Sequence, residues 1–232
     1  MSDPDFAWLD AGTAYFEARL DGADLDGDSA LPGWTRRHVV AHVAANARAL
    51  GRLAHWARTG EESPMYTSAQ ARDDEIEELA KLAPAEILAL AGRTASELRS
   101  ALRELPTPAW AAPVRTAQGR TVPASEIVWM RCREMWVHAV DLGTGGGFED
   151  FPAALLDALL TDVTGLWARR GQERGLVLAP VDRHGVWRVD GPAQASPAQV
   201  SAVRGTAAEL AAWVTGRGPA PHPDAPAIGR WL

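Results

Sequence analysis

The run "ASEIVWMRCREMWVHAVDL", residues 124–142, sets the strongest constraint on how this chain folds. Its apolar residues recur at helical spacing, so the run predicts a buried helix that begins near Ser125 and stops at Gly143. Glu134 and His138 interrupt the apolar pattern at positions i and i+4, which share one face of a helix. Because burying an unpaired charge is costly, this face must meet a partner that compensates both side chains.

Other amphipathic runs precede this helix and predict what it packs against. A helix is expected over residues 4–23, and a longer one follows Thr35 and stops at Gly60. Residues 68–105 predict a short acidic helix and a longer helix that starts at Pro84, a favoured first-turn residue. Long amphipathic helices with short connections favour an antiparallel four-helix bundle.

The boundaries of this bundle can be placed from the change in pattern. Residues 106–124 are rich in Pro and Gly and predict a loop or hairpin within the bundle. The glycine-rich segment "GTGGGFED" then separates residues 1–145 from residues 146–232. We therefore expect two domains, a helical bundle over residues 1–145 and a smaller domain over residues 146–232.

The second domain has an α+β pattern. A helix is expected over residues 151–171, and the short apolar runs "GLVLAPV" and "GVWRVDGP" predict strands. Residues 196–218 predict one or two helices, and the proline-rich tail is expected to lie along the surface. The fold class of the whole chain is therefore expected to be α+β.

Composition excludes several classes of protein. The formal net charge is −7, and no basic tract with interleaved aromatic residues is present, so a nucleic-acid partner is not expected. No apolar run reaches the length of about 20 residues that spans a bilayer, and the N-terminus lacks the pattern of a secretory signal. With a single cysteine, Cys132, the chain fits a reducing compartment. We expect a cytoplasmic protein that does not associate with membranes and that is a monomer.

A metal ion would compensate the charged face of the helix at 124–142. His42, in the apolar stripe of "HVVAHVAANA", is a candidate third ligand from the helix after Thr35. Two imidazoles and one carboxylate are a frequent ligand set of catalytic zinc, and they leave a fourth position for water or substrate. The spacing leaves alternatives open, because His38 also pairs with His42 at i and i+4, and because Arg131 and Arg133 are neighbouring partners for Glu134.

Cys132 is a weaker candidate for chemistry. It lies two residues before Glu134, about 200° around the helix, so it should point away from the Glu134 and His138 face. We interpret it as a small buried hydrophobic residue.

The chain resembles the mycothiol-dependent maleylpyruvate isomerases, members of the DinB-like metalloenzyme group, over nearly its whole length. The segments that carry the resemblance are "GWTRRHVVAHVAANA", "HWARTGEESPMY", "TAQGRTVPASE", "WMRCREMWVHAVDLG", "GLVL", "TGRG" and "RWL". The resemblance implies a DinB-like bundle followed by a smaller C-terminal domain. It also places the zinc ligands on His42, Glu134 and His138, and the functional arginine on Arg217.

The activity implied by the resemblance is a cis–trans isomerisation. Mycothiol, bound to zinc as a thiolate, would add to the double bond of maleylpyruvate and be expelled after rotation, giving fumarylpyruvate in gentisate degradation. Arg217 would bind a carboxylate or the developing enolate oxygen. From the residues alone, Arg217 could instead be a solvated charge that complements a helix end. Likewise, "AQGR" at 117–120 could be a turn or a loop that contacts the cofactor, which leaves the roles of Gln118 and Arg120 open.

Two other functions are compatible with the same residues. A mycothiol S-transferase on this zinc scaffold would consume the thiol, whereas an isomerase regenerates it. A non-catalytic protein that binds a metal or small ligand would use zinc structurally, and such a site is closed by a fourth protein ligand. No obvious fourth ligand occurs in the motifs, which favours an enzyme.

Overall fold

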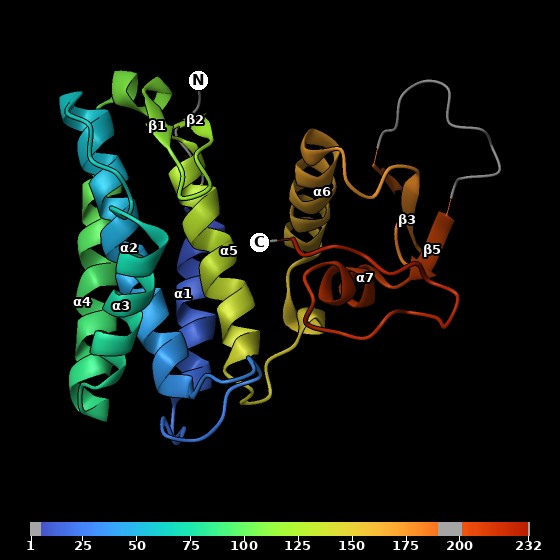
Figure 1. The fold of residues 1–232 in the computed structure, drawn as a ribbon, viewed down its shortest axis with the longest axis horizontal. Coiled ribbons are helices and arrows are strands. Elements are labelled where there is room, and N and C mark those ends of the chain that lie inside the picture. The colour runs from blue at the N-terminus through green and yellow to red at the C-terminus, as the bar shows by residue number, and fades with distance from the viewer. Residues whose placement is uncertain (1–5, 190–200, 232) are drawn as a thin grey trace. The chain divides into compact units, whose positions relative to one another are not determined.

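A computed structural model of the chain describes residues 6–189 and 201–231 (Figure 1). These residues divide into two compact units, Met1–Gly146 and Gly147–Leu232. The first unit is helical apart from one short hairpin, and the second unit combines helices with a small sheet. The α+β class expected from the sequence is therefore confirmed. None of the described helices is both long enough and apolar enough to cross a membrane.

The N-terminal unit is built on four longer helices and one shorter helix. The helices are α1 (Ala7–Leu20), α2 (Arg36–Thr59), α3 (Ala69–Ala80), α4 (Pro84–Arg103) and α5 (Glu126–Asp141). Helix α5 packs against α1 and α2, and α2 also packs against α4 and α3. Helix α2 is central to these contacts because small and branched apolar residues occupy almost every inward position along it, and most of them are fully buried.

The ends of these helices follow the signals in the sequence. Thr35 is the N-cap of α2, and its backbone N–H donates to Nδ1 of His38 (3.2 Å). Gly60 ends the same helix in the left-handed conformation, with φ of 78°, and its N–H donates to the Trp56 carbonyl. Helix α4 starts at Pro84 as predicted. Ser125 is the N-cap residue of α5. Gly143, another glycine with positive φ, follows the C-cap of this helix.

The segment between α4 and α5 forms a short turn of 3₁₀-helix, η1 (Thr107–Ala111), and an antiparallel hairpin. Its strands β1 (Pro113–Arg115) and β2 (Thr121–Pro123) pair Val114 with Val122. Both valines are buried, while their strand neighbours are exposed, so one face of the hairpin packs on the bundle. The "AQGR" segment is the hairpin turn, closed by a bond from the Thr116 N–H to the Arg120 carbonyl.

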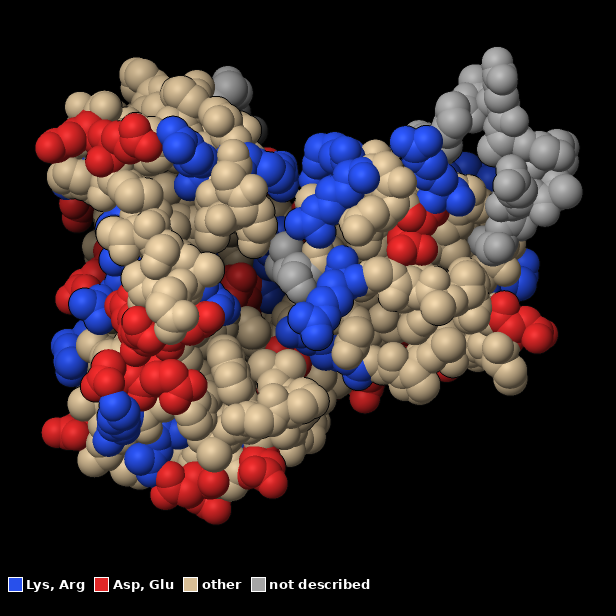
Figure 2. All heavy atoms as spheres, in the orientation of Figure 1, with Lys and Arg blue, Asp and Glu red and all other residues tan. Residues whose placement is uncertain are grey.

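Helix α3 packs against α2, buries one side chain fully and presents acidic residues to solvent. Ile76 is the buried residue of this helix. The acidic residues of "DDEIEE" surround it in sequence, and Figure 2 shows acidic side chains gathered over the α3 region of the N-terminal unit. A helix held by one buried side chain gains little from burial, so α3 derives support from polar contacts such as Arg48 with Glu75 (3.0 Å).

In the described part of the C-terminal unit, two α-helices lie beside a three-stranded sheet. Its elements are η2 (Phe148–Asp150), α6 (Ala153–Arg170), β3 (Leu176–Pro180), β4 (Trp187–Arg188), β5 (Ser201–Gly205) and α7 (Ala207–Val214). The central strand β3 pairs antiparallel with β4 and parallel with β5. Leucine and tryptophan side chains of α6, including the fully buried Trp167, form much of the core of this unit.

One expectation for this unit is wrong. Residues 196–218 were expected to be helical, but Ser201–Gly205 form β5, and only Ala207–Val214 are helical within the described part of that range. The strand is fixed by five residue pairs with β3, a long-range partner that local periodicity cannot reveal. Residues 196–200 of that prediction lie outside the described residues.

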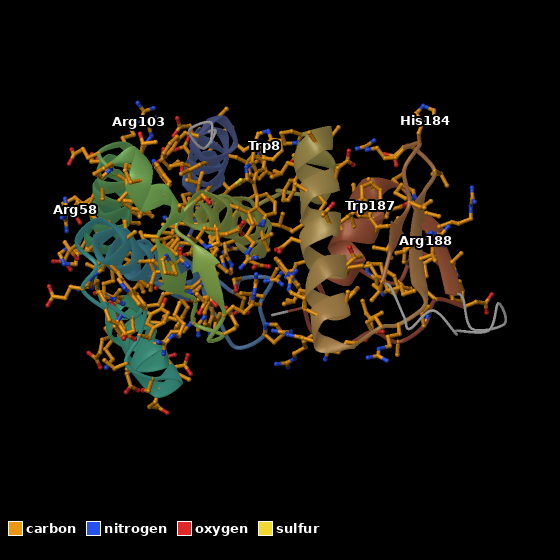
Figure 3. All side chains as sticks on the ribbon, turned by 90° about the horizontal axis from the view of Figure 1, so that it is seen from above. Trp8, Arg58, Arg103, His184, Trp187 and Arg188 are labelled. Carbon is orange, nitrogen blue, oxygen red and sulfur yellow. The ribbon has the colours of Figure 1, made fainter. Side chains whose placement is uncertain are left out.

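Trp187 and His184 show how the β3–β4 connection is anchored. The indole N–H of Trp187 donates to the Thr161 hydroxyl of α6 (2.8 Å). Figure 3 shows Trp187 on the inner side of this connection and His184 at its outer tip. His184 is exposed and takes no part in a cluster of metal-binding side chains among the described residues.

The left-handed end of α2 gives a test of the fold. We expect Gly60→Ala to lower the free energy of unfolding by about 1 kcal/mol, because a Cβ is strained at positive φ. Gly51→Ala, in the middle of the same helix, also adds a methyl group in open space but without that strain. It should stabilise the protein by about 0.5–1 kcal/mol. Urea denaturation followed by circular dichroism measures both, and equal effects of the two changes would contradict the assignment.

Candidate metal centre

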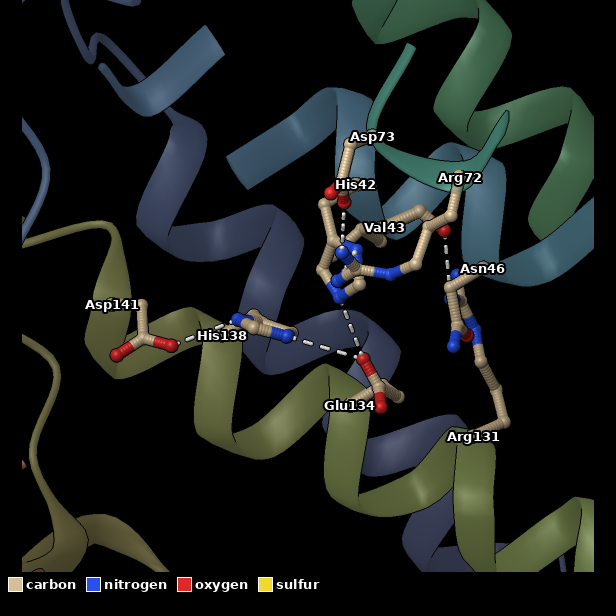
Figure 4. A network of polar contacts seen from close by, with 9 residues as sticks. All are labelled: His42, Val43, Asn46, Arg72, Asp73, Arg131, Glu134, His138 and Asp141. Carbon is tan, nitrogen blue, oxygen red and sulfur yellow. Dashed lines mark hydrogen bonds and ion pairs between the residues drawn. The ribbon is translucent and has the colours of Figure 1, made fainter. Parts of the chain in front are cut away.

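His42, Glu134 and His138 converge between α2 and α5. Oε2 of Glu134 lies 3.0 Å from Nε2 of His42 and 3.1 Å from Nε2 of His138 (Figure 4). One ligand atom from each residue can be chosen so that all three lie within 4.8 Å of one another. His42 is 6% exposed, and the other two side chains are largely buried.

The local sequence explains this convergence. The i, i+4 spacing places Glu134 and His138 one above the other on α5. Alanines and valines fill the buried positions of α2 around His42, and α2 packs against α5. Neither helix could form the site alone, because α5 supplies two of the three side chains and α2 supplies the third.

Hydrogen bonds define where the protons lie. Both ring nitrogens of His138 face carboxylates, Nε2 toward Glu134 and Nδ1 toward Asp141 (2.8 Å), so both donate and the ring carries a positive charge. His42 donates from Nε2 to Glu134, and its Nδ1 accepts from Nη2 of Arg72 at 3.4 Å, which describes a neutral ring. One imidazolium therefore balances the Glu134 carboxylate.

The pKa values agree with this assignment. Burial, together with repulsion from His138, lowers the pKa of His42 to about 4. Burial also acts to lower the pKa of His138, but hydrogen bonds to Asp141 and Glu134 outweigh it and raise the pKa to about 9. For Glu134, burial acts to raise the pKa, but the bonds from the two imidazoles hold it well below its usual range. The three groups behave as one coupled unit.

The contacts settle two of the alternatives that the spacing left open, His38 and Arg131. His38 turns to Thr35, and its Nε2 lies 3.6 Å from Glu77 of α3, so it does not join the cluster. Arg131 donates to the Val43 carbonyl and the Asn46 side chain instead of forming an ion pair with Glu134. Glu134 thus bonds to the two imidazoles and not to Arg131.

The structure adds three residues that the sequence reasoning missed. Asp141 is fully buried and holds Nδ1 of His138; the spacing "HAVD", with Asp three residues after His, was a readable signal for this contact. Arg72 arrives from α3, and the Trp34 ring lies 5.8 Å from the His42 ring between centroids. The last two depend on how α3 and the segment before α2 fold back, which no local pattern in the sequence indicates.

Arg217 and Cys132 are not members of this cluster of three side chains. Arg217 belongs to the C-terminal unit, directly after α7, where its Nη1 donates to the Thr215 carbonyl (2.6 Å). Its catalytic role stays a prediction. Cys132 is 2% exposed, and burial raises the pKa of its thiol to about 12, so the thiolate that a nucleophile requires is not accessible near neutral pH.

The donor set fits a divalent metal ion such as zinc. Two imidazole nitrogens and a carboxylate oxygen are three protein ligands of the kind found in catalytic zinc sites. Asp141 is the outer partner that commonly fixes the ring and tautomer of a ligating histidine. Within the described residues the cluster has three members, which leaves room for a further ligand that is not protein.

These features define a class, a helical bundle with a candidate metal centre of two histidines and one glutamate, joined to a small α+β unit. Residues 8–143 match the family model described as the mycothiol maleylpyruvate isomerase N-terminal domain. The chain belongs to the mycothiol-dependent maleylpyruvate isomerase family, a family of enzymes.

Solved structures give the same assignment over both units. The crystal structure of the mycothiol-dependent maleylpyruvate isomerase has 39% sequence identity and a TM-score of 0.85, covering 94% of each chain. A histidine-to-alanine mutant of that isomerase matches with 38% identity, the same TM-score and the same coverage. Comparison with curated protein sequences found no match.

The contact between Asp141 and His138 can be tested by metal affinity. We expect Asp141→Asn to weaken zinc binding about 10–100-fold, because an amide orients the ring less strongly and makes it a poorer donor of electrons. Competition with a chromophoric chelator measures the change. Asp74→Asn on the exposed face of α3 is the matched control and should bind zinc as the wild type does. An unchanged affinity in Asp141→Asn would show that this contact does not support the ligand.

The proton arrangement predicts a pH dependence of metal binding. His138 is protonated below a pKa of about 9 and must lose this proton to ligate through Nε2. His42 only needs to shift its proton from Nε2 to Nδ1. Zinc affinity should therefore rise about tenfold per pH unit between pH 6 and 8, with about one proton released per ion. Calorimetry in buffers of different ionisation enthalpy counts that proton, and a flat affinity would contradict the assignment.

Proposed function

We propose that the protein is a mycothiol-dependent cis–trans isomerase that converts maleylpyruvate to fumarylpyruvate. The observation that carries the proposal is the convergence of His42, Glu134 and His138 in a chain of this family. The three residues are the proposed metal ligands, with zinc as the metal and mycothiol as the thiol cofactor. The partners of the protein are then small molecules, a dicarboxylate substrate and mycothiol.

The chemistry needs a nucleophile that can add to a conjugated double bond and leave again. Zinc at these ligands would supply a Lewis acid that lowers the pKa of a coordinated thiol, and mycothiol would supply the thiolate that makes the double bond single until it is expelled. A disubstituted cis double bond cannot rotate otherwise, because its π bond would have to break.

The side chains of the bundle hold this chemistry in place. Glu134 and the two imidazoles provide one negative charge in total, which leaves a divalent cation with a positive charge to attract anions. Asp141 fixes the His138 ring. When His42 ligates the metal through Nε2, its proton lies on Nδ1, which then cannot accept a hydrogen bond from Arg72. The Arg72 guanidinium thereby becomes available to a substrate carboxylate.

The two domains divide the work in this proposal. The bundle over residues 1–145 binds the metal, and the C-terminal α+β domain over residues 146–232 supplies Arg217. A guanidinium can pair with a substrate carboxylate or stabilise the enolate oxygen that forms on addition. A donor of this kind lowers a barrier by about 2.7–4 kcal/mol in acyl-transfer enzymes. The cellular setting that we propose is gentisate degradation in the cytoplasm.

One assay tests the function. Maleylpyruvate is supplied to zinc-analysed protein with a catalytic amount of mycothiol, and fumarylpyruvate and free thiol are both followed. We expect many turnovers per thiol, lost on chelation and restored by zinc. Thiol consumed in a one-to-one ratio with substrate would indicate an S-transferase on the same scaffold. Bound zinc with no reaction would contradict the isomerase proposal.

Variants assign the roles within this assay. His42→Ala, Glu134→Ala and His138→Ala should each lower zinc content and turnover, and full zinc retention in all three would exclude them as ligands. Arg217→Ala should keep zinc and lose about 100-fold or more in kcat/KM. Cys132→Ser is the matched control: it removes the chain's thiol and should leave turnover unchanged. Wild-type kcat/KM in Arg217→Ala would remove that residue from the mechanism.

A further inference from the structure

The segment "HWARTGEESPMY" ends in Tyr66, within the connection between α2 and α3. Arg52 of α2 holds this end of the connection, because its Nε donates to the Met65 carbonyl (2.9 Å) and to the Pro64 carbonyl (3.2 Å). The guanidinium carbon of the same arginine lies 5.7 Å from the centre of the Tyr66 ring. Two backbone bonds and a cation–π contact thus hold Tyr66 against α2.

The Tyr66 hydroxyl lies within the electric field of the candidate metal centre. Arg72 of α3 and Glu134 of α5 are the two charges that act on it most strongly. Arg72 is itself beside the centre, with its Nη2 3.4 Å from Nδ1 of His42 (Figure 4). The hydroxyl is also coupled to Arg131, which precedes Glu134 by three residues on α5. Because such interactions weaken with distance, Tyr66 lies near the centre on the side that α3 occupies.

The hydroxyl of Tyr66 is available to a bound molecule. The side chain is partly buried, and its hydroxyl makes no hydrogen bond with the described residues. The hydroxyl oxygen nevertheless keeps accessible surface, unlike the fully buried unpaired nitrogen Nη2 of Arg131. A phenylalanine ring would pack against Arg52 in the same way, so packing alone does not explain why a hydroxyl is present here.

The protonation state of Tyr66 suits a hydrogen-bond donor. Burial raises the pKa of Tyr66 to about 12, and the positive charge of Arg72 only partly opposes that shift. The phenol therefore keeps its proton at neutral pH and can donate it in a hydrogen bond. This neutral donor differs from Arg72 and Arg217, whose positive charges suit the two carboxylates of the proposed substrate.

We propose that Tyr66 is a catalytic residue of the isomerase, whose hydroxyl donates a hydrogen bond to the ketone oxygen conjugated with the substrate double bond. The inference rests on the proposed function. When a nucleophile bonds to one carbon of the double bond, the π electrons move and the ketone oxygen becomes an enolate oxygen. Expulsion of the nucleophile returns those electrons, so no oxidant is required. A donor already in place stabilises the enolate charge and keeps its own proton throughout.

The test compares Tyr66→Phe with the wild type, both as the zinc-loaded full chain. We expect kcat to fall about 100-fold, because the enolate charge loses a donor. Calorimetry with the saturated analogue of maleylpyruvate, which has the same ketone and carboxylates but no double bond, gives a readout without turnover. Its affinity should fall less than about tenfold, because a neutral ketone gains little from the hydrogen bond. Tyr15→Phe removes the chain's other tyrosine hydroxyl, on α1, and is the matched control with unchanged kcat.

The outcomes separate this inference from the proposed function. An active wild type with an unimpaired Tyr66→Phe variant would overturn the role of Tyr66 alone, and so would equal losses in kcat and in affinity for the analogue. A Tyr66→Phe variant that loses zinc or fails to fold would also overturn it, because the hydroxyl would then be structural. A wild type that does not isomerise maleylpyruvate would refute the proposed function and this inference together.

Discussion

The carboxylate of Glu134, placed between two imidazoles, is the interaction on which the N-terminal unit depends. A buried carboxylate is tolerable only with close partners, and His42 and His138 provide them from two different helices. The pairing requires α2 and α5 to pack in one register. Asp141 extends the same network to the end of α5. The buried charge pairs therefore require the packing of α2 against α5, and that packing holds the charge pairs together.

The sequence predicted most of the bundle because its signals were local. Thr35, Gly60 and Pro84 mark helix ends through backbone chemistry that needs no tertiary partner. Glu134 and His138 interrupt the apolar face of one helix, and this local pattern predicted that other groups compensate their buried charges. Whether His38 or Arg131 would join that site could not be read from spacing, since it depends on side-chain direction and on α3. In the second unit, β5 was missed because its partner β3 lies more than twenty residues away.

Arg72 and Arg131 show two ways in which a positive charge is held near α5. Arg72 is partly exposed and bonds to both Asp73 and the ring of His42, so it can exchange one acceptor for another. Arg131 is fully buried and held by a backbone carbonyl and an amide, without a carboxylate in hydrogen-bond contact. The first arrangement lets Arg72 change its partner beside the candidate metal centre, and the second holds the charge of Arg131 in one place within the bundle.

The distribution of the three candidate ligands over α2 and α5 has a consequence for folding. An isolated α5 can present only Glu134 and His138, so an unfolded or partly folded chain holds a metal ion weakly compared with the native bundle. Any ion that binds the native state preferentially stabilises it by mass action, by about 4.1 kcal/mol at a free concentration 1,000 times the Kd. A metal ion held by the three candidate ligands would therefore stabilise the native bundle as well as complete the candidate site.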